Sequence, residues 1–217
     1  MHIFQKQILD QLRQTSQLRY SDLQPDDVES GHFKYHLDQL IKEGLVEQVD
    51  RGVYRLSVKG KSKVDRLSSD RVNPHLTPKV ITYTLLQDEE HFYLVEKQKQ
   101  PYLGLINMVG GKVHLGESTD EACIREVFEK TNIKLDSAKL LGVAQIRINH
   151  EQNLLSHAVA FVYIADIKYD TEMHKELIQI PKAKVHSFKN PAPDTLQLID
   201  SINSSSQLFS ADLDIQY

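Results

Sequence analysis

Residues 110–135, GGKVHLGESTDEACIREVFEKTNIKL, constrain the fold and the chemistry of this chain more than any other stretch. Two glycines and a glutamate precede a predicted helix that carries Arg125, Glu126 and Glu129. Flexible backbone is thus followed by a helix face rich in carboxylates, which Mg²⁺ binds together with water and substrate phosphates. The stretch predicts a cradle for a cation and a phosphate group, except that Lys130 stands where a second carboxylate of a metal-binding pair is expected.

Both ends of this predicted helix carry capping residues. Ser118 and Glu121 have the spacing of a capping box, in which the two side chains satisfy unpaired amide groups at the helix start. We therefore assign Glu121 a structural role and do not expect it to replace a missing metal ligand. Asn132 follows the helix, and after Gly it is the residue that best adopts the left-handed conformation of a helix C-cap.

Runs typical of β-strands surround this helix, and a last helix with an apolar side follows them. The first two runs are separated only by polar residues 88–90, which predicts an antiparallel pair, and the fourth run is apolar enough to be buried on both faces. Strands around a glycine loop and a helix, closed by a terminal helix, predict an α/β sandwich. The predicted strands are 79–87, 91–99, 140–149 and 156–167, and the predicted last helix lies within 190–205.

The first third of the chain has a different pattern. It predicts a helix over 4–13, a short helical turn within 20–28, and a third helix whose residues Phe33, Leu37, Leu40 and Ile41 share one face. Gly44 supplies the left-handed residue that ends this helix. His32, Lys34, Tyr35, His36 and Gln39 are expected to point largely outward. Residues 45–57 alternate about the turn Asp50-Arg51-Gly52, which predicts a short hairpin.

Composition restricts the class of protein. The chain has 217 residues, 40% of them apolar and 26% charged, as in ordinary globular proteins, and no segment is long and apolar enough to span a bilayer. The first 14 residues are typical of an amphipathic helix and not of a signal peptide, so we expect a cytoplasmic protein without a membrane partner. Cys123 is given no role, and the ten histidines are scattered, so we expect no zinc site.

A basic patch lies at the boundary of the first third. Residues 51–71 hold seven Lys or Arg side chains against two Asp side chains. Such a patch suits a phosphate backbone, and on charge alone it equally suits a solvated helix face. The segment that follows, within 68–80, concentrates Ser, Asn and Pro without an apolar period and is typical of a linker.

Three helices followed by a two-stranded wing resemble a winged helix-turn-helix domain, and the run FKYHLDQLIKEGLVEQVDRGVYRLSVKGK is similar to the recognition helix and wing of bacterial repressors. The resemblance implies binding to double-stranded DNA. Lys34, Tyr35, His36 and Gln39 would contact bases or phosphates in a major groove, and Arg51 would approach a minor groove. It also implies a homodimer if the DNA site is palindromic. A protein-docking or dimerisation module remains the alternative.

The opening stretch resembles the Nudix box, and the residues that match its pattern are Gly111, Glu117, Arg125, Glu126, Val127, Glu129 and Ile133. The predicted organisation is a winged helix (α+β) over 1–70, a linker over 71–78, and a Nudix-type α/β/α sandwich with a mixed sheet over 79–217. The resemblance implies Mg²⁺ as cofactor, held by Glu126 and Glu129 with the carbonyl of Gly110. It also implies that Glu117 and Arg125 orient the catalytic Glu126.

Lys130 departs from this pattern, and three interpretations stay open. Lys130 replaces one metal ion by a fixed positive charge and keeps affinity for a diphosphate. Alternatively, a further carboxylate, such as Glu151 or Glu172, restores a metal site. Finally, the site is vestigial and Lys130 is a surface partner of Glu126, since it lies four residues later in the favoured orientation for a helical ion pair.

Three functions follow from these interpretations. The first is a regulator in which a nucleoside-diphosphate-linked metabolite, bound with weak or absent hydrolysis, changes the DNA affinity of the winged helix. Nudix-related regulators of NAD metabolism are a precedent, although we expect their winged domain to follow the Nudix domain. The second is a Mg²⁺-dependent Nudix pyrophosphohydrolase, and the third is a purely structural protein, so enzymatic activity stays open.

The predicted ligand contacts come from the loop and from nearby strands. They are Gly110, Gly111, Lys130, Tyr102 and Arg147, with Phe92 as a further stacking candidate. An aromatic residue in an alternating strand is more often part of the core, and this alternative stands for Tyr102 and Phe92.

Overall fold

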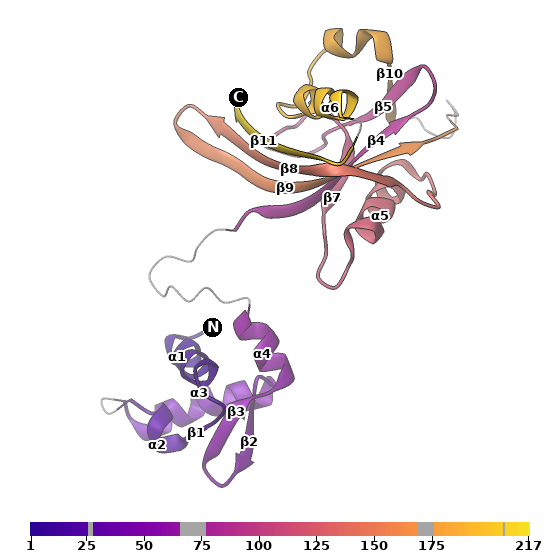
Figure 1. Cartoon of the computed structure of the whole chain (residues 1–217). Helices are drawn as coiled ribbons and strands as arrows, with labels where there is room; N and C mark the ends of the chain where they lie inside the picture. The colour runs from indigo at the N-terminus through magenta and orange to yellow at the C-terminus, as the bar shows by residue number, and fades with distance from the viewer. Residues whose placement is uncertain (26–27, 66–76, 169–175, 206) are drawn as a thin grey trace. The chain divides into compact units, whose positions relative to one another are not determined.

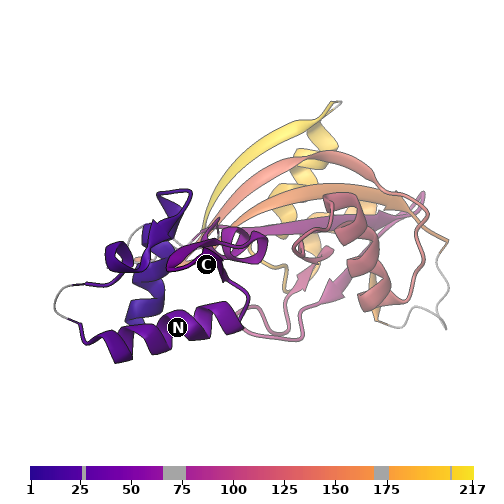
Figure 2. The same ribbon diagram turned by 90° about the horizontal axis from the view of Figure 1, so that it is seen from below.

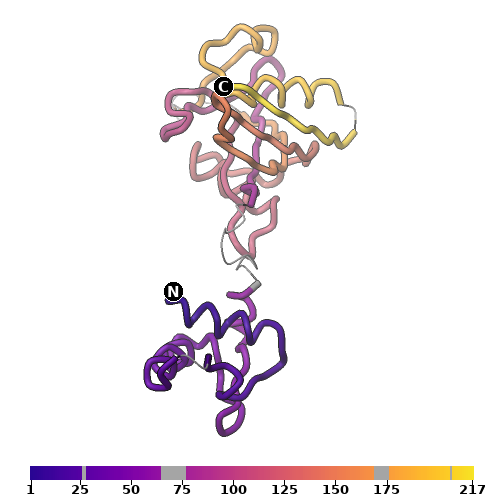
Figure 3. Tube along the Cα trace, turned by 90° about the vertical axis from the view of Figure 1, so that its left-hand side faces the viewer, coloured from indigo at the N-terminus to yellow at the C-terminus, as the bar shows by residue number. Residues whose placement is uncertain are grey.

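The computed structural model describes residues 1–25, 28–65, 77–168, 176–205 and 207–217. The chain divides into two units, Met1–Leu76 and Thr77–Tyr217, and Figure 3 traces both. Within the described parts of the chain, no helix is long and apolar enough to cross a membrane.

The first unit combines helices with a small antiparallel sheet of order β1-β3-β2 (Figure 1). This arrangement fits a winged helix, as the order of predicted elements indicated. The second helix is a single turn of four residues, as predicted. The elements are α1 (Ile3–Arg13), β1 (Leu18–Arg19), α2 (Tyr20–Leu23), α3 (Ser30–Lys42), β2 (Val46–Asp50), β3 (Val53–Leu56) and α4 (Val58–Asp65).

The core of this unit is formed by the apolar faces of its helices. In α1 the buried residues are Ile8, Leu9 and Leu12, which are at most 2% exposed, and they meet Phe33 and Leu37 of α3. Helix α3 ends at Lys42, and the chain then turns through Gly44 at φ +70°, a conformation that glycine adopts without strain.

One expectation about α3 is wrong. His36 was predicted to point outward, but it is only 7% exposed, and its ring stacks on His2 with the centroids 3.9 Å apart. The start of α1 covers this face of α3, which the periodicity of α3 alone does not reveal. Burial, together with the neighbouring His2 and His32, lowers the pKa of His36.

The second unit is built on one mixed sheet of order β10-β5-β4-β9-β8-β11, to which β6 and β7 add at β5 and β4. The pairs β4–β9 and β8–β11 are parallel, and the other pairs are antiparallel. The strands are β4 (Lys79–Gln87), β5 (His91–Glu96), β6 (Ile106–Asn107), β7 (Val109–Lys112), β8 (Lys139–His150), β9 (Asn153–Asp166), β10 (Leu177–Pro181) and β11 (Phe209–Gln216).

Helices cover both faces of this sheet, which makes the predicted α/β/α sandwich. Helix α5 (Thr119–Thr131) lies on one face, while α6 (Thr195–Ser204) and the 3₁₀ helix η1 (Lys182–Ser187) lie on the other (Figure 1). The core under α6 includes Leu94, Val162 and Leu198, and a separate core under α5 includes Val109 and Val127.

The end of the chain differs from the prediction. A terminal helix was expected to close the sandwich, but α6 is followed by β11, which pairs in parallel with β8 along eight residues. Figure 2 shows β11 in yellow at the edge of the curved sheet. Its residues alternate between partly buried and exposed, as expected for an edge strand with one covered face.

Candidate ligand-binding site

Helix α5 is capped as the sequence predicts. The Ser118 side chain accepts a hydrogen bond from the Glu121 amide, and the Glu121 carboxylate accepts one from the Ser118 amide, so the capping box is confirmed. At the other end Asn132 takes the left-handed conformation, with φ 56°. These caps fix which residues of α5 face the glycine-bearing strand β7.

Arg125 and Glu117 hold the loop before α5 in place. The guanidinium donates to both oxygens of Glu117, at 2.6 and 3.0 Å, and to the carbonyl oxygen of Lys112 at 3.0 Å. Glu117 also accepts a hydrogen bond from the His114 amide. The Arg125 bond, followed by the His114 bond, lowers the pKa of Glu117 to about 2. This pair therefore joins the end of β7, the loop and the helix.

Glu126 lies directly against the backbone of Gly111. Its side chain is 9% exposed, and a Cβ atom added to Gly111 would overlap the carboxylate. Only glycine allows this approach, so the position of the Glu126 carboxylate requires glycine at 111. Gly110 is restricted in a different way, since a Cβ atom there would overlap the carbonyl of Thr82 on β4.

Lys130 contacts both the backbone of Gly110 and the carboxylate of Glu126. Its ammonium donates a hydrogen bond to the carbonyl oxygen of Gly110 and lies 3.0 Å from Oε2 of Glu126. Arg125 donates to the other carboxylate oxygen of Glu126 at 2.9 Å. Burial raises the pKa of Glu126, but the bonds from Arg125 and Lys130 outweigh burial, and the net pKa is lowered. Glu126 is thus an ionised carboxylate held between two cations.

These residues do not fit the magnesium ion that the Nudix pattern implies. The carbonyl of Gly110 and a carboxylate oxygen of Glu126 both point at an ammonium, which supplies the positive charge and leaves no place for a metal ion between them. Glu129 is 54% exposed and accepts a hydrogen bond from Arg125 at 3.3 Å. Within the described ranges, the box carboxylates form no group of three that could hold a metal.

Of the two acidic residues considered as replacement ligands, Glu151 lies in the described part of the chain. Glu151 is exposed in the turn between β8 and β9, and none of the described contacts joins it to Glu126 or Glu129. Glu172 lies outside the described residues.

A cavity of about 240 Å³ opens beside Gly110 and Gly111, on the sheet face opposite α5. Its floor is formed by apolar side chains of β4, β8 and β9, and four lysines line it: Lys79, Lys97, Lys99 and Lys112. Burial, followed by the positive charge of Lys130, lowers the pKa of Lys97 to about 8. Burial and the charge of Lys112 lower the pKa of Lys79. Such a concentration of ammonium groups favours an anionic ligand.

One wall of this cavity is a buried polar network. Asn107 donates hydrogen bonds to Tyr83 at 3.2 Å and to Asp194 at 3.1 Å. Burial raises the pKa of Asp194. Sequence reasoning missed these residues, along with the four lysines. The lysines lie on or next to predicted strands, but nothing in the sequence brings them to one cavity.

The three aromatic and basic residues proposed as ligand contacts have different positions. Tyr102 lines the cavity, and its ring packs edge-on against Tyr217. Arg147 does not line it, because Ile146 and Ile148 face the cavity and Arg147 points to the other face, where it pairs with Asp212 at 2.5 Å. Phe92 is 4% exposed and belongs to the core, as its alternative interpretation held.

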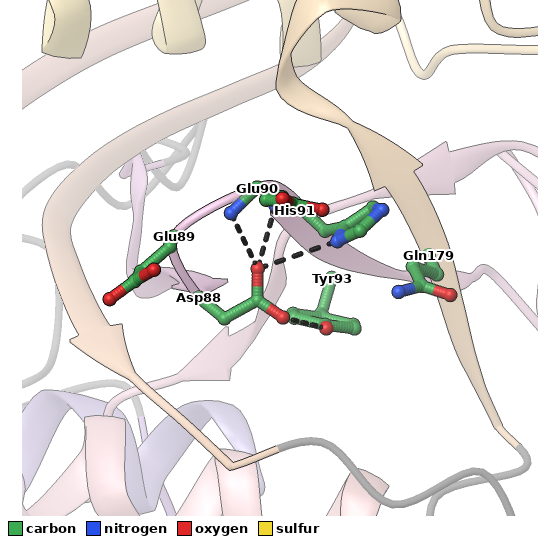
Figure 4. Close-up of a pocket in the computed structure, with 6 residues that line it drawn as sticks. All are labelled: Asp88, Glu89, Glu90, His91, Tyr93 and Gln179. Atoms are coloured by element: carbon green, nitrogen blue, oxygen red, sulfur yellow. Dashed lines mark hydrogen bonds and ion pairs between the residues drawn. The ribbon is translucent and has the colours of Figure 1, made fainter.

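A second hollow lies at the turn between β4 and β5 (Figure 4). There the carboxylate of Asp88 accepts hydrogen bonds from the Glu90 and His91 amides and from the Tyr93 hydroxyl. The Tyr93 bond is the largest cause that lowers the pKa of Asp88 to about 2. These hydrogen bonds occupy the Asp88 carboxylate with groups of the turn and of β5, so we assign Asp88 a structural role.

The residues proposed to contact DNA lie in the first unit. Lys34 and Tyr35 on α3 are exposed, Gln39 is half-buried, and Arg51 is exposed in the turn between β2 and β3. His36 is buried and is not available to a major groove. Lys59, Lys61 and Lys63 of α4 are exposed as well, and two further basic residues of the patch, Arg66 and Arg71, lie outside the described residues.

The Nudix class of fold is defined by a mixed sheet between helices, in which a glycine-bearing strand leads into a helix that carries carboxylates. Residues 75–201 match the NUDIX domain family. Because this match covers more than half of the chain, the chain belongs to the Nudix family.

Individual relatives are distant. The ADP-ribose pyrophosphatase of Methanocaldococcus jannaschii is 27% identical over 93 residues, 43% of this chain and 53% of that protein. A putative 8-oxo-dGTP diphosphatase of Bacillus subtilis is 28% identical over 120 residues, 51% of this chain and 78% of that protein. The chain thus spans about half the length of the first relative.

Solved structures show the same fold. A NUDIX hydrolase from Nitrosomonas europaea superposes with a TM-score of 0.50 and 17% identity, covering 61% of this chain and 93% of that one.

Proposed function

We propose that this protein is a ligand-responsive regulator. Its Nudix domain binds a nucleoside-diphosphate-linked metabolite with weak or absent hydrolysis, and the bound ligand changes the affinity of the winged helix for double-stranded DNA. The observation that carries the proposal is the ammonium of Lys130, which bonds the Gly110 carbonyl and lies 3.0 Å from the Glu126 carboxylate.

The loss of hydrolysis follows from the position of this ammonium. In metal-assisted phosphoryl chemistry, a divalent cation gathers positive charge at the oxygens where negative charge develops and activates the attacking water. An ammonium supplies one positive charge but cannot lower the pKa of a bound water as a metal ion does. The site therefore attracts a diphosphate and lacks the means to cleave it.

The ligand class follows from the cavity beside Gly110; Lys130 bonds the carbonyl of Gly110 but does not line the cavity itself. Lys79, Lys97, Lys99 and Lys112 offer positive charge for a diphosphate, and the apolar floor and Tyr102 offer surface for a nucleoside. The curated relatives are named for ADP-ribose, in which a diphosphate joins a nucleoside to a second sugar, and for 8-oxo-dGTP, a nucleoside triphosphate. These names support the ligand class and do not select one member of it.

The test of ligand binding is calorimetric titration of the full chain with ADP-ribose, ADP and UDP-glucose, in EDTA and in Mg²⁺. We expect at least one compound to bind equally well in both buffers. The variant Lys97→Met should weaken this binding about tenfold, while Lys139→Met, at an exposed position on β8, should leave it unchanged. Binding that needs Mg²⁺ would contradict the proposal.

The DNA part of the proposal rests on the exposed residues of α3 and the wing. Lys34, Tyr35 and Arg51 project into solvent from the elements that a winged helix presents to DNA. Selection of bound duplexes from a random library tests it, followed by anisotropy titration with and without ligand. We expect the ligand to change the DNA affinity, since a regulator must bind its ligand differently in its two states. Absence of any selected duplex would refute this part.

A Mg²⁺-dependent pyrophosphohydrolase is the second candidate function. The intact Glu117–Arg125–Glu126 network and the exposed Glu129 favour it, because they are the parts of a Nudix box that orient its catalytic carboxylate. It requires that Lys130 leave its position and that a further carboxylate enter.

Homodimerisation belongs to the regulator proposal, since a palindromic DNA site needs two recognition helices. Size-exclusion chromatography with light scattering tests it.

A further inference from the structure

Three histidines meet where α1 and α3 pack against each other. Figure 1 shows α1 against α3. His2 precedes α1, and His32 and His36 lie one helical turn apart on α3. Each offers one ring nitrogen, and these three atoms all lie within 4.8 Å of one another. The expectation of no zinc site rested on scattered histidines, but His32 and His36 do have the three-residue spacing of two ligands on one helix face.

The distance between two of the rings matches a shared metal ion. Nε2 of His32 and Nε2 of His36 are 3.2 Å apart. Two nitrogens bound to one tetrahedral Zn²⁺ at about 2.05 Å would lie about 3.3 Å apart. The ligand atom of His2 already lies within 4.8 Å of the other two, but its ring stacks on that of His36 with the centroids 3.9 Å apart. The His2 ring therefore has to turn off the His36 ring before all three nitrogens can bind one ion.

The buried ring of His36 also has an unsatisfied atom. Its side chain is 7% exposed, and its Nδ1 atom has no hydrogen-bond partner among the described residues. A buried polar atom without a partner costs free energy. Because this atom is Nδ1, an ion bound at Nε2 beside His32 leaves that cost in place. Aromatic side chains surround the cluster, since the ring of Phe4 meets His32 edge-on at 5.3 Å and Tyr35 meets His36 at 5.2 Å.

From this geometry we propose that His2, His32 and His36 bind one divalent transition-metal ion, with Zn²⁺ as the best fit. Imidazole suits Zn²⁺, Cu²⁺ and Ni²⁺ and does not suit Mg²⁺, which takes oxygen ligands. Three histidines leave the fourth position of a tetrahedral ion open to water. The ion ties the start of α1 to α3, so it fixes the first turn of α1 on the helix that we propose to read DNA.

The test is calorimetric titration of Zn²⁺ into the metal-free full chain, prepared without a tag before Met1. We expect one equivalent to bind at this site, and at least tenfold weaker binding in His2→Asn and in His32→Gln. Asn at position 2 keeps an N-capping side chain while removing the imidazole, and both changes are at exposed positions. His186→Gln, which alters an exposed histidine of the second unit, should bind Zn²⁺ as the unchanged protein does.

A second measurement keeps the result independent of folding. Nuclear magnetic resonance of the imidazole nitrogens should show Zn²⁺ shifting His2, His32 and His36 and leaving His186 unchanged. Circular dichroism checks whether both variants remain folded. Zn²⁺ binding that is equally tight in His32→Gln and the unchanged protein, or unshifted signals of the three rings, would overturn the proposal.

Discussion

Replacing Lys130 by methionine removes the ammonium that joins Glu126 to the carbonyl of Gly110, while keeping a side chain of similar length. A hydrogen bond to a charged group contributes about 1.5–3 kcal/mol. Lys130 is 36% exposed and Arg125 continues to pair with Glu126, so solvent screening and the remaining partner reduce this contribution. We expect the free energy of unfolding at pH 7 to fall by about 1–2 kcal/mol.

The loss should depend on pH in a defined direction. The pKa of Glu126 is lowered in the folded protein, so its ionised form stabilises the fold above the unfolded pKa of about 4.3 and this stabilisation is lost as pH falls through the folded pKa. Removing the Lys130 ammonium removes part of the cause that lowers the pKa of Glu126. The difference between Lys130→Met and the unchanged protein should therefore be full at pH 7 and shrink below about pH 4.

Urea unfolding of the full chain at pH 7, 5 and 3.5 measures this difference, with Lys139→Met as the matched control at an exposed position. The spectroscopic probe has to report the unfolding of the second unit, because the two units need not unfold together. A loss no greater than that of the control would show that Lys130 does not stabilise Glu126. A loss of equal size at every pH would assign the effect to packing instead of charge.

Three further predictions concern the glycine loop, the cavity and the wing. Gly111→Ala should destabilise the protein by about 1–3 kcal/mol, because the new methyl group displaces the Glu126 carboxylate. Gly31→Ala on α3, where a Cβ meets no close atom, should not destabilise it, and thermal unfolding compares the two variants. The affinity for a nucleoside diphosphate should fall as pH rises through about 8, where Lys97 loses its proton, and calorimetry should find no such fall in Lys97→Arg. Arg51→Glu should weaken binding to the selected DNA about tenfold in anisotropy titrations, and Lys189→Glu, at an exposed position in the second unit, should have no effect.

The sequence predicts the local geometry around α5 well, because that geometry depends on contacts within a short stretch of chain. The capping box of Ser118 and Glu121, the left-handed Asn132 and the pairing of Lys130 with Glu126 are all confirmed. The bond from Lys130 to the carbonyl of Gly110 has no local signal, since it joins residues 20 positions apart on different elements.

Two of the misses, at His36 and Arg147, involve an element far away in sequence. His36 is buried because the start of α1 covers α3. Arg147 lies on the face of β8 opposite Ile146 and Ile148, where it pairs with Asp212 of β11 and does not reach the cavity. The strand β11 did have a signal, since Phe209, Ala211, Leu213 and Ile215 alternate with polar residues, but it was not assigned.

The most direct test of the central claim is product analysis of the unchanged protein and of Lys130→Glu, each incubated with Mg²⁺ and a panel of nucleoside diphosphates linked to a second group. If the ammonium of Lys130 stands where the family holds a cation, the unchanged protein should cleave none of the panel. Lys130→Glu, which restores the carboxylate of the Nudix pattern, should gain Mg²⁺-dependent cleavage of at least one member. Cleavage by the unchanged protein would contradict the account and make it a hydrolase.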